Sequence, residues 1–194
     1  MYKRQKQYPV TLKIAYSETS IKLTALIRLV LVIPIIIVLT LISSYTEALS
    51  VAVALMILFR EKYPVWWFDW NLALTKFSLR IAAYALLMRD EYPSTDADQA
   101  IQVGIPYPDV KKDLNRWMPL VKWFLAIPHF IVLLFMFIAV VFCSVFAWFS
   151  ILFTGRYPKG IFDFVEGFLR WALRVTAYVF LLTTDEYPPF RLGE

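Results

Sequence analysis

The sequence contains few of the residues on which most enzyme active sites depend. Its 194 residues include five glycines, one cysteine and one histidine. It has no glycine-rich phosphate-binding loop, no G-x-S-x-G nucleophile motif and no H-E-x-x-H zinc motif. The lone Cys143 has no partner for an internal disulfide, and His129 has no neighbouring Cys, Asp or Glu with which to bind a metal. The sequence therefore predicts no catalytic residue, no metal site and no cofactor.

Charge is also scarce. Charged residues make up 18% of the chain and hydrophobic residues 60%, with a mean hydropathy of +0.60, whereas soluble domains are about 45–50% apolar. Within residues 117–153, the only ionisable side chains apart from Cys143 are Lys122 and His129. A bilayer span needs only about 20 apolar residues. The composition predicts an integral membrane protein, in preference to a soluble protein with one very long core helix, and no signal-peptide cleavage site follows the first apolar run.

An internal repeat runs through the chain. Pro34, Tyr63-Pro64, Asp69, Arg80 and Tyr84 recur 94 residues later as Pro128, Tyr157-Pro158, Asp163, Arg174 and Tyr178. The tetrapeptide Asp-Glu-Tyr-Pro at 90–93 recurs at 185–188. We interpret it as the polar end of a helix, with a cation or partner site formed by both copies as the alternative. The repeat predicts two similar halves about a pseudo-two-fold axis: 8–93 as the first membrane repeat, 94–100 as a linker and 101–190 as the second.

Each copy begins with alternating apolar residues. They are Val10, Leu12, Ile14 and Tyr16 in the first copy and Ile101, Val103, Ile105 and Tyr107 in the second. This period of two predicts a short amphipathic strand in each copy. A two-fold axis through the pair would make the two strands antiparallel. Extended linkers lying on lipid headgroups are the alternative.

A long apolar run follows each strand, at residues 23–59 and 117–153. A straight helix of this length would reach about 55 Å, nearly twice the roughly 30 Å of a bilayer core. The polar residues Ser43–Glu47 predict a turn in the first run, while Phe137–Val141 gives the second no polar break. A proline about a dozen residues into each run predicts a kink. We expect each run to be a Pro-kinked helical hairpin.

An amphipathic helix closes each copy, at 68–87 and 162–182. Its charges share one face, which we take as the candidate surface for lipid or a protein partner. The residues of that surface are Asp69, Lys76, Arg80, Tyr84, Asp163, Arg170, Arg174 and Tyr178. An arginine at the bilayer centre costs roughly 2.5–3.5 kcal/mol. We therefore expect these helices to lie in the interface, with membrane crossing as the alternative.

The basic residues favour the hairpin arrangement. Hairpins place every basic loop on one side of the membrane, as the positive-inside rule requires, whereas single crossings put Arg60, Lys62, Arg156 and Lys159 outside. Both arrangements predict about four crossings with both termini cytoplasmic. The net charge of +5 indicates anionic lipid headgroups as partners. No basic run stands apart from the membrane-flanking segments, which argues against nucleic acid.

The second copy resembles a known family. The stretches Ile151–Phe164, Arg170–Tyr178 and Thr184–Phe190, with Leu-Ala-Ile-Pro-His at 125–129, are similar to domain-of-unknown-function family 4389 of bacterial membrane proteins. The first copy resembles it more loosely, because Glu61 stands where the second copy has a glycine. The resemblance implies a tandem arrangement in a bacterial inner membrane and carries no assigned activity.

Three classes of function fit these observations. The first, which we favour, is a non-catalytic membrane scaffold or accessory subunit that contacts lipid, a larger membrane complex or a second copy of itself. The second is a small transporter or channel with Arg80 and Arg174 lining a polar path. The third is a lipid-modifying enzyme that uses Asp69, Asp163 or His129 at the interface.

Overall fold

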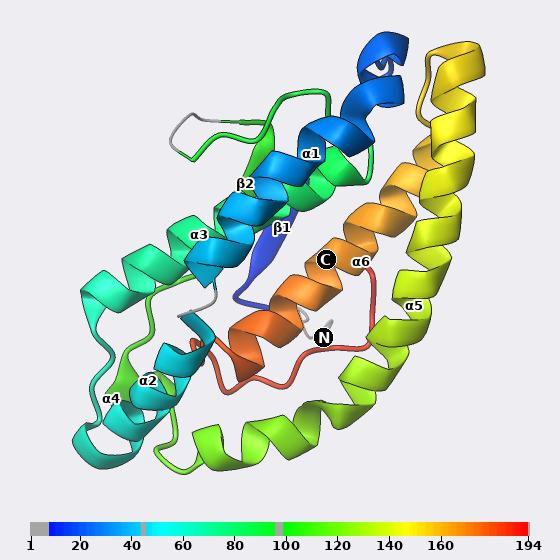
Figure 1. The fold of residues 1–194 in the computed structure, drawn as a ribbon. Helices are drawn as coiled ribbons and strands as arrows, with labels where there is room; N and C mark the ends of the chain where they lie inside the picture. The colour runs from blue at the N-terminus through cyan, green and yellow to red at the C-terminus, as the bar shows by residue number, and fades with distance from the viewer. Residues whose placement is uncertain (1–7, 44–45, 96–98, 194) are drawn as a thin grey trace.

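A computed structural model describes residues 8–43, 46–95 and 99–193. The fold is mostly helical, as expected, and each copy contains a strand, then an apolar helical arm, then an amphipathic helix (Figure 1). The elements are β1 (Thr11–Ile14), α1 (Lys22–Ser43), α2 (Thr46–Arg60), α3 (Val65–Ala85), β2 (Ile101–Gly104), α4 (Val110–Asp113), α5 (Met118–Thr154) and α6 (Lys159–Val179).

The two long apolar runs differ from each other. The first is divided into α1 and α2 at the polar segment, and Ser44 and Tyr45 lie outside the described residues. The second is a single helix of 37 residues, so the predicted hairpin is wrong for this copy. Its centre holds no polar residue that could satisfy the backbone groups of a turn, and an unbroken helix satisfies them internally. Pro128 lies inside α5, and Figure 1 shows that this helix is strongly curved.

The amphipathic helices begin earlier than predicted. Pro64 and Pro158 have extended backbone angles immediately before α3 and α6, so each helix begins at the residue after the Tyr-Pro pair. Both helices end before a leucine with a left-handed backbone, φ 66° at Leu87 and φ 56° at Leu182. The same ending in both copies is consistent with the internal repeat.

The two predicted strands pair with each other. They are antiparallel, with Leu12 opposite Val103 and Thr11 opposite Gly104. Leu12 and Val103 occupy equivalent places in the two alternating patterns, so this register is the one that a two-fold axis through their pair requires. Leu12 and Ile14 are buried and Thr11 is exposed, as expected for a strand with one apolar face.

Each strand packs against the opposite copy. The Tyr16 hydroxyl in the first copy donates to the Tyr157 carbonyl in the second at 2.7 Å. Reciprocally, the Tyr107 hydroxyl donates to the Tyr63 carbonyl at 2.5 Å. The Tyr16 ring also contacts Phe162 edge-on, and the Tyr107 ring contacts Phe68 in the same way. The copies are therefore interlocked through exchanged strands and share one core.

The ends of the long helices also meet across the two copies. Before α1, the Ser20 amide donates to the Gly155 carbonyl at the end of α5, at 2.9 Å. Before α5, Arg116 donates to the Leu58 carbonyl at the end of α2, at 2.9 Å. Gly155 has a φ of 73°, and Glu61 at the equivalent position has a φ of 48°. The first copy thus forms a left-handed helix end without the glycine.

Most of the outer surface of α5 is apolar. Five of its phenylalanines are 63–79% exposed, namely Phe124, Phe135, Phe142, Phe146 and Phe153. Within the described residues, α5 is long and apolar enough to cross a membrane, and α1, which bends by 52° between Lys22–Arg28 and Val30–Ser43, is a second candidate when its two parts are taken together. An apolar surface of this size marks contact with a membrane or another protein.

The strand exchange predicts that neither half folds without the other. Halves 1–97 and 98–194, co-expressed as separate chains, should co-purify. Leu12→Asp, which places a charge in the shared core, should abolish most of this recovery, whereas Lys13→Gln on the exposed face of the same strand should leave it unchanged. Affinity capture through a tag on one half measures the result. Recovery of either half alone as a stable, monodisperse species would contradict the exchange.

Candidate functional site

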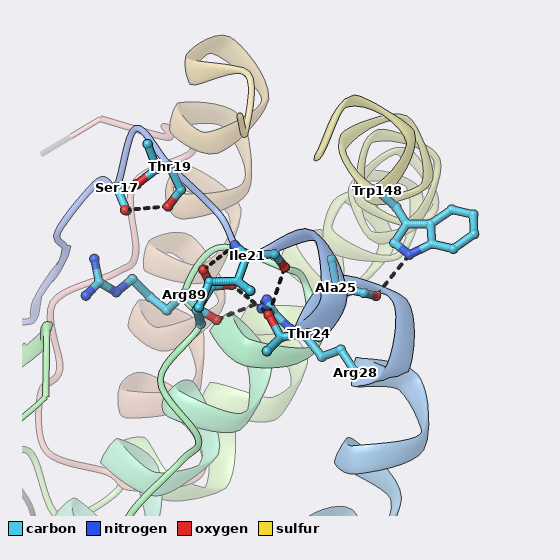
Figure 2. A network of polar contacts seen from close by, with 9 residues as sticks. Ser17, Thr19, Ile21, Thr24, Ala25, Arg28, Arg89 and Trp148 are labelled. Atoms are coloured by element: carbon cyan, nitrogen blue, oxygen red, sulfur yellow. Dashed lines mark hydrogen bonds and ion pairs between the residues drawn. The ribbon is translucent and has the colours of Figure 1, made fainter. Parts of the chain in front are cut away.

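A buried cation in each copy is held by the aspartate of the Asp-Glu-Tyr-Pro tetrapeptide. In the first copy, Arg28 of α1 pairs with Asp90 and donates to the Arg89 carbonyl at 3.1 Å. The other oxygen of Asp90 accepts from the Ile21 amide at 2.9 Å. Figure 2 shows Ile21, Thr24 and Arg28 at the start of α1. They lie beside Arg89, which follows α3. One carboxylate therefore joins the exit of α3 to the beginning of α1.

The second copy repeats this arrangement with a lysine. Lys122 of α5 pairs with Asp185 at 2.7 Å and donates to the Thr184 carbonyl at 2.8 Å. Asp185 also accepts from the Asn115 amide, which precedes α5. Arg28 and Lys122 are each 1% exposed, so both charges are removed from solvent and neutralised inside the protein.

Two tyrosines complete each cluster. The cation lies over the ring of Tyr84 at 4.8 Å in the first copy and over the ring of Tyr178 at 5.0 Å in the second. A second tyrosine, Tyr92 or Tyr187, contacts that ring edge-on. A cation over an aromatic face is stabilised further when both are desolvated. We call Arg28, Tyr84, Asp90 and Tyr92 the first ion-pair cluster, and Lys122, Tyr178, Asp185 and Tyr187 the second.

Sequence reasoning assigned no role to the two cations. Arg28 and Lys122 are separated by the same 94 residues as the other repeated positions, and each is a lone charge near the start of an apolar run. A charge in that setting requires a partner. The repeated tetrapeptide was the partner, and the common spacing was the signal that could have identified it.

The arginines of the predicted lipid surface point into the protein. Arg80 donates to the Ser94 carbonyl at 2.6 Å, and Arg174 donates to the Gly193 carbonyl at 2.9 Å. Arg170 donates to the Leu12 carbonyl at 3.0 Å and pairs with Glu166 at 3.1 Å. All three arginines are at most 9% exposed. They therefore hold the chain segments that follow α3 and α6, and strand β1, in place.

The remaining candidates divide between the core and the surface. Tyr84 and Tyr178 are buried within the ion-pair clusters. Asp69 and Asp163 are exposed, and Asp163 pairs with Lys159 at 2.7 Å. Lys76 is half-buried. The predicted surface is thus not continuous: most of its polar groups serve internal contacts, and lipid or partner binding by the exposed members stays a prediction.

His129 is fully enclosed. Its Nδ1 accepts from the Trp171 indole at 3.1 Å, and its ring stacks on Phe190 at 4.0 Å. Among the described residues, no group of three or more His, Cys, Asp or Glu side chains is placed to hold a metal ion. The Trp171 hydrogen bond and the Phe190 stacking are those of a packed residue with a local hydrogen bond.

The turn before α3 carries a similarly enclosed phenol. The Tyr63 hydroxyl donates to the Leu181 carbonyl at 2.7 Å. Burial, with a smaller contribution from Tyr107, raises the pKa of Tyr63 well above its usual range. The phenol stays protonated and acts as a donor between the copies rather than as a catalytic base.

Comparison with protein families identifies both copies. Residues 22–95 and 116–191 match the domain of unknown function DUF4389. The chain belongs to the DUF4389 family. Comparison with curated proteins and with solved structures finds no match. The ion-pair clusters recur in both DUF4389 repeats, with the cation near the start of the matched region and the aspartate near its end.

The second ion-pair cluster predicts a non-additive mutational effect. Lys122→Met leaves Asp185 partly buried without its cation and should lower the free energy of unfolding by about 3 kcal/mol. The double variant Lys122→Met, Asp185→Asn should recover at least half of that loss. Thermal unfolding of the purified protein in detergent measures both. Asp69→Asn, at an exposed carboxylate, serves as the control. Equal destabilisation by the single and double variants would contradict a coupled pair.

Proposed function

We propose that this DUF4389 protein is a non-catalytic integral membrane scaffold or accessory subunit. The observation that carries the proposal is the distribution of polarity: the longest helix presents phenylalanines outward, whereas the buried cations are paired inside. Only 11% of the most apolar 18-residue segment of α5 is buried in the protein. Such a surface is stable in a bilayer or against an apolar partner and costly in water.

Contacts between loops support an arrangement in which the connecting segments share one side of the membrane. If α1–α2, α3 and α5 each crossed once, Ser20 and Gly155 would lie on opposite faces, roughly 30 Å apart. Their backbones are hydrogen-bonded at 2.9 Å. The bond from Arg116 to Leu58 argues against the same crossings, because α3 would be the only crossing between these two residues. The β1–β2 pairing places the two strands on one side as well. We therefore propose that both ends of the arms α1–α2 and α5 lie on one side of the membrane, in place of four separate crossings. The unbroken, curved α5 then lies in the membrane without crossing it.

The exposed basic residues support the cytoplasmic side for these loops. Several of them lie at the two ends of α5. Lys111, Lys112 and Arg116 precede this helix, and Arg156 and Lys159 follow it. Arg60 and Lys62 are also exposed, at the end of α2. The positive-inside rule assigns all of these segments, and with them both termini, to the cytoplasmic face of a bacterial inner membrane. These residues, rather than the buried arginines, are the proposed contacts for anionic headgroups.

The two other functions have less support. A polar path lined by Arg80 and Arg174 would need their guanidinium groups to be available to an ion, and both are bonded to carbonyls of the chain itself. An interfacial enzyme that uses His129 would need substrate to reach a ring with no exposed surface. A scaffold requires neither group to be accessible.

Cysteine labelling at the two ends of α5 tests the membrane arrangement. In a Cys143→Ala background, Lys111→Cys and Lys159→Cys should both be shielded from an impermeant thiol reagent added to intact cells. Both should react after permeabilisation, which controls for local accessibility. Labelling of only one of the two positions in intact cells would show that α5 crosses the membrane, and the one-sided arrangement would fail.

A second prediction separates the exposed basic residues from the buried ones. Lys62→Gln with Arg156→Gln removes two exposed charges at equivalent places in the repeats, each contributing about 1 kcal/mol of attraction to anionic lipid. The ratio of phosphatidylglycerol to phosphatidylcholine retained on the purified protein should fall about thirtyfold, as read by native mass spectrometry. Arg174→Gln should leave this ratio unchanged and lower the thermal stability instead. The reverse pattern would restore the arginine face as the lipid-binding surface.

A further inference from the structure

A cavity lies between α3 and α6, beside the division between α1 and α2. Its volume is about 380 Å³, within the usual range for small-molecule sites. Ser43, at the end of α1, and Ser50, in α2, line the side where the first arm is divided. The cavity therefore opens beside the arm that we place in the membrane.

The lining of the cavity is apolar with a few uncharged polar groups. Leucines, alanines and a phenylalanine form most of it, and none of the described lining residues carries a charge. Asn71, Thr75 and Ser78 follow one another along α3 at helical spacing, and Thr176 faces the same space from α6. A phosphate or carboxylate would find no cation here, so the chemistry selects an uncharged ligand.

One of these polar groups is buried and lacks a full set of hydrogen bonds. Asn71 is 6% exposed, and its amide nitrogen donates to the Trp67 carbonyl at 2.7 Å. Its Oδ1 has no hydrogen-bond partner within the described part of the chain. Neither do the hydroxyls of Thr75 and Thr176, whereas Ser78 donates to the Leu74 carbonyl at 2.8 Å. Asn71 Oδ1 is therefore a free acceptor on a side chain that lines the cavity, and a ligand hydroxyl would satisfy it.

The second copy does not repeat this polarity. The positions equivalent to Asn71, Thr75 and Ser78 are Val165, Leu169 and Ala172. The equivalent helix α6 therefore forms without these polar side chains. Their presence on α3 calls for a reason other than folding.

We propose that this cavity binds one neutral lipid that carries a free hydroxyl group, of the monoacylglycerol class. The hydroxyl donates to Asn71 Oδ1 and accepts from the Thr75 or Thr176 hydroxyl, while the acyl chain lies along the leucines of α3 and α6. The proposal rests on the membrane placement above only for the route by which the lipid arrives. A soluble protein with the same cavity would still bind the lipid from a micelle.

Photolabelling of the full-length protein in detergent tests the site. The probe is a monoacylglycerol with a diazirine in its acyl chain, and mass spectrometry locates the labelled peptides. Label should appear on α3 and α6, and unlabelled oleoylglycerol should displace it at concentrations at least tenfold lower than oleate, which has the same chain and a charge. Label confined to the outer face of α5, or displacement by oleate at equal concentration, would overturn the proposal.

Two variants decide the role of the polar groups. The triple variant Asn71→Leu, Thr75→Val, Thr176→Val keeps side-chain volume approximately and should reduce labelling of α3 and α6 at least tenfold. Ala172→Phe, which fills the cavity from the opposite helix, should abolish it. Thr154→Val, at the exposed end of α5, is the matched control and should label as the unaltered protein does. Thermal unfolding verifies that each variant is folded, and full labelling of a folded triple variant or of folded Ala172→Phe would refute the site.

Discussion

Asp90 and Asp185 each bring together the end of an amphipathic helix, the start of an apolar arm and a cation inside that arm. Without this carboxylate, the arm would hold an unpaired charge in an apolar surrounding, and a backbone amide just before the arm would lose its acceptor. The tyrosine under the cation and the neighbouring backbone carbonyl complete the set of contacts. The two apolar arms are thus oriented by polar contacts at their ends. The centres of the arms are left free to be apolar on their outer sides.

The exchange of strands determines what the two copies can do separately. Tyr16 and Tyr107 each donate across the copies, and the two-fold register places Leu12 against Val103 in the shared core. A mutation in either strand therefore acts on both halves. This interlocking also explains why the loops are close together. Bonds join the connecting segments of the two copies at both ends of the arms, and the apolar arms run alongside the amphipathic helices, α1 by α3 and α5 by α6 (Figure 1).

Local patterns in the sequence predicted the parts of the fold that depend on them. The alternation around Leu12 and Val103 predicted the strands and their antiparallel pairing, whereas the predicted starts of α3 and α6, at residues 68 and 162, were three residues too late. The charged face of these helices was read as a surface, because charge on an amphipathic helix usually faces water or headgroups. Instead, Arg80 and Arg174 bind the chain segments that follow their own helices, contacts between distant parts of the chain that helical periodicity does not reveal. The unbroken course of α5 was likewise hidden, since length alone suggested a hairpin.

Differences between the copies separate what the fold needs from what it does not. The ion-pair clusters, the exchanged tyrosines and the reciprocal helix ends occur in both, although arginine is replaced by lysine and glycine by glutamate. The arm is divided in one copy and continuous in the other, so the fold accepts either course. Asn71 and Thr75 are replaced by Val165 and Leu169 in the second copy, and α6 still forms. Polar side chains in an apolar setting are costly unless they are satisfied. Asn71 and Thr75 occur only in the first copy, beside the division of its arm. This is the physical reason to look for a ligand there, rather than at the clusters that both copies share.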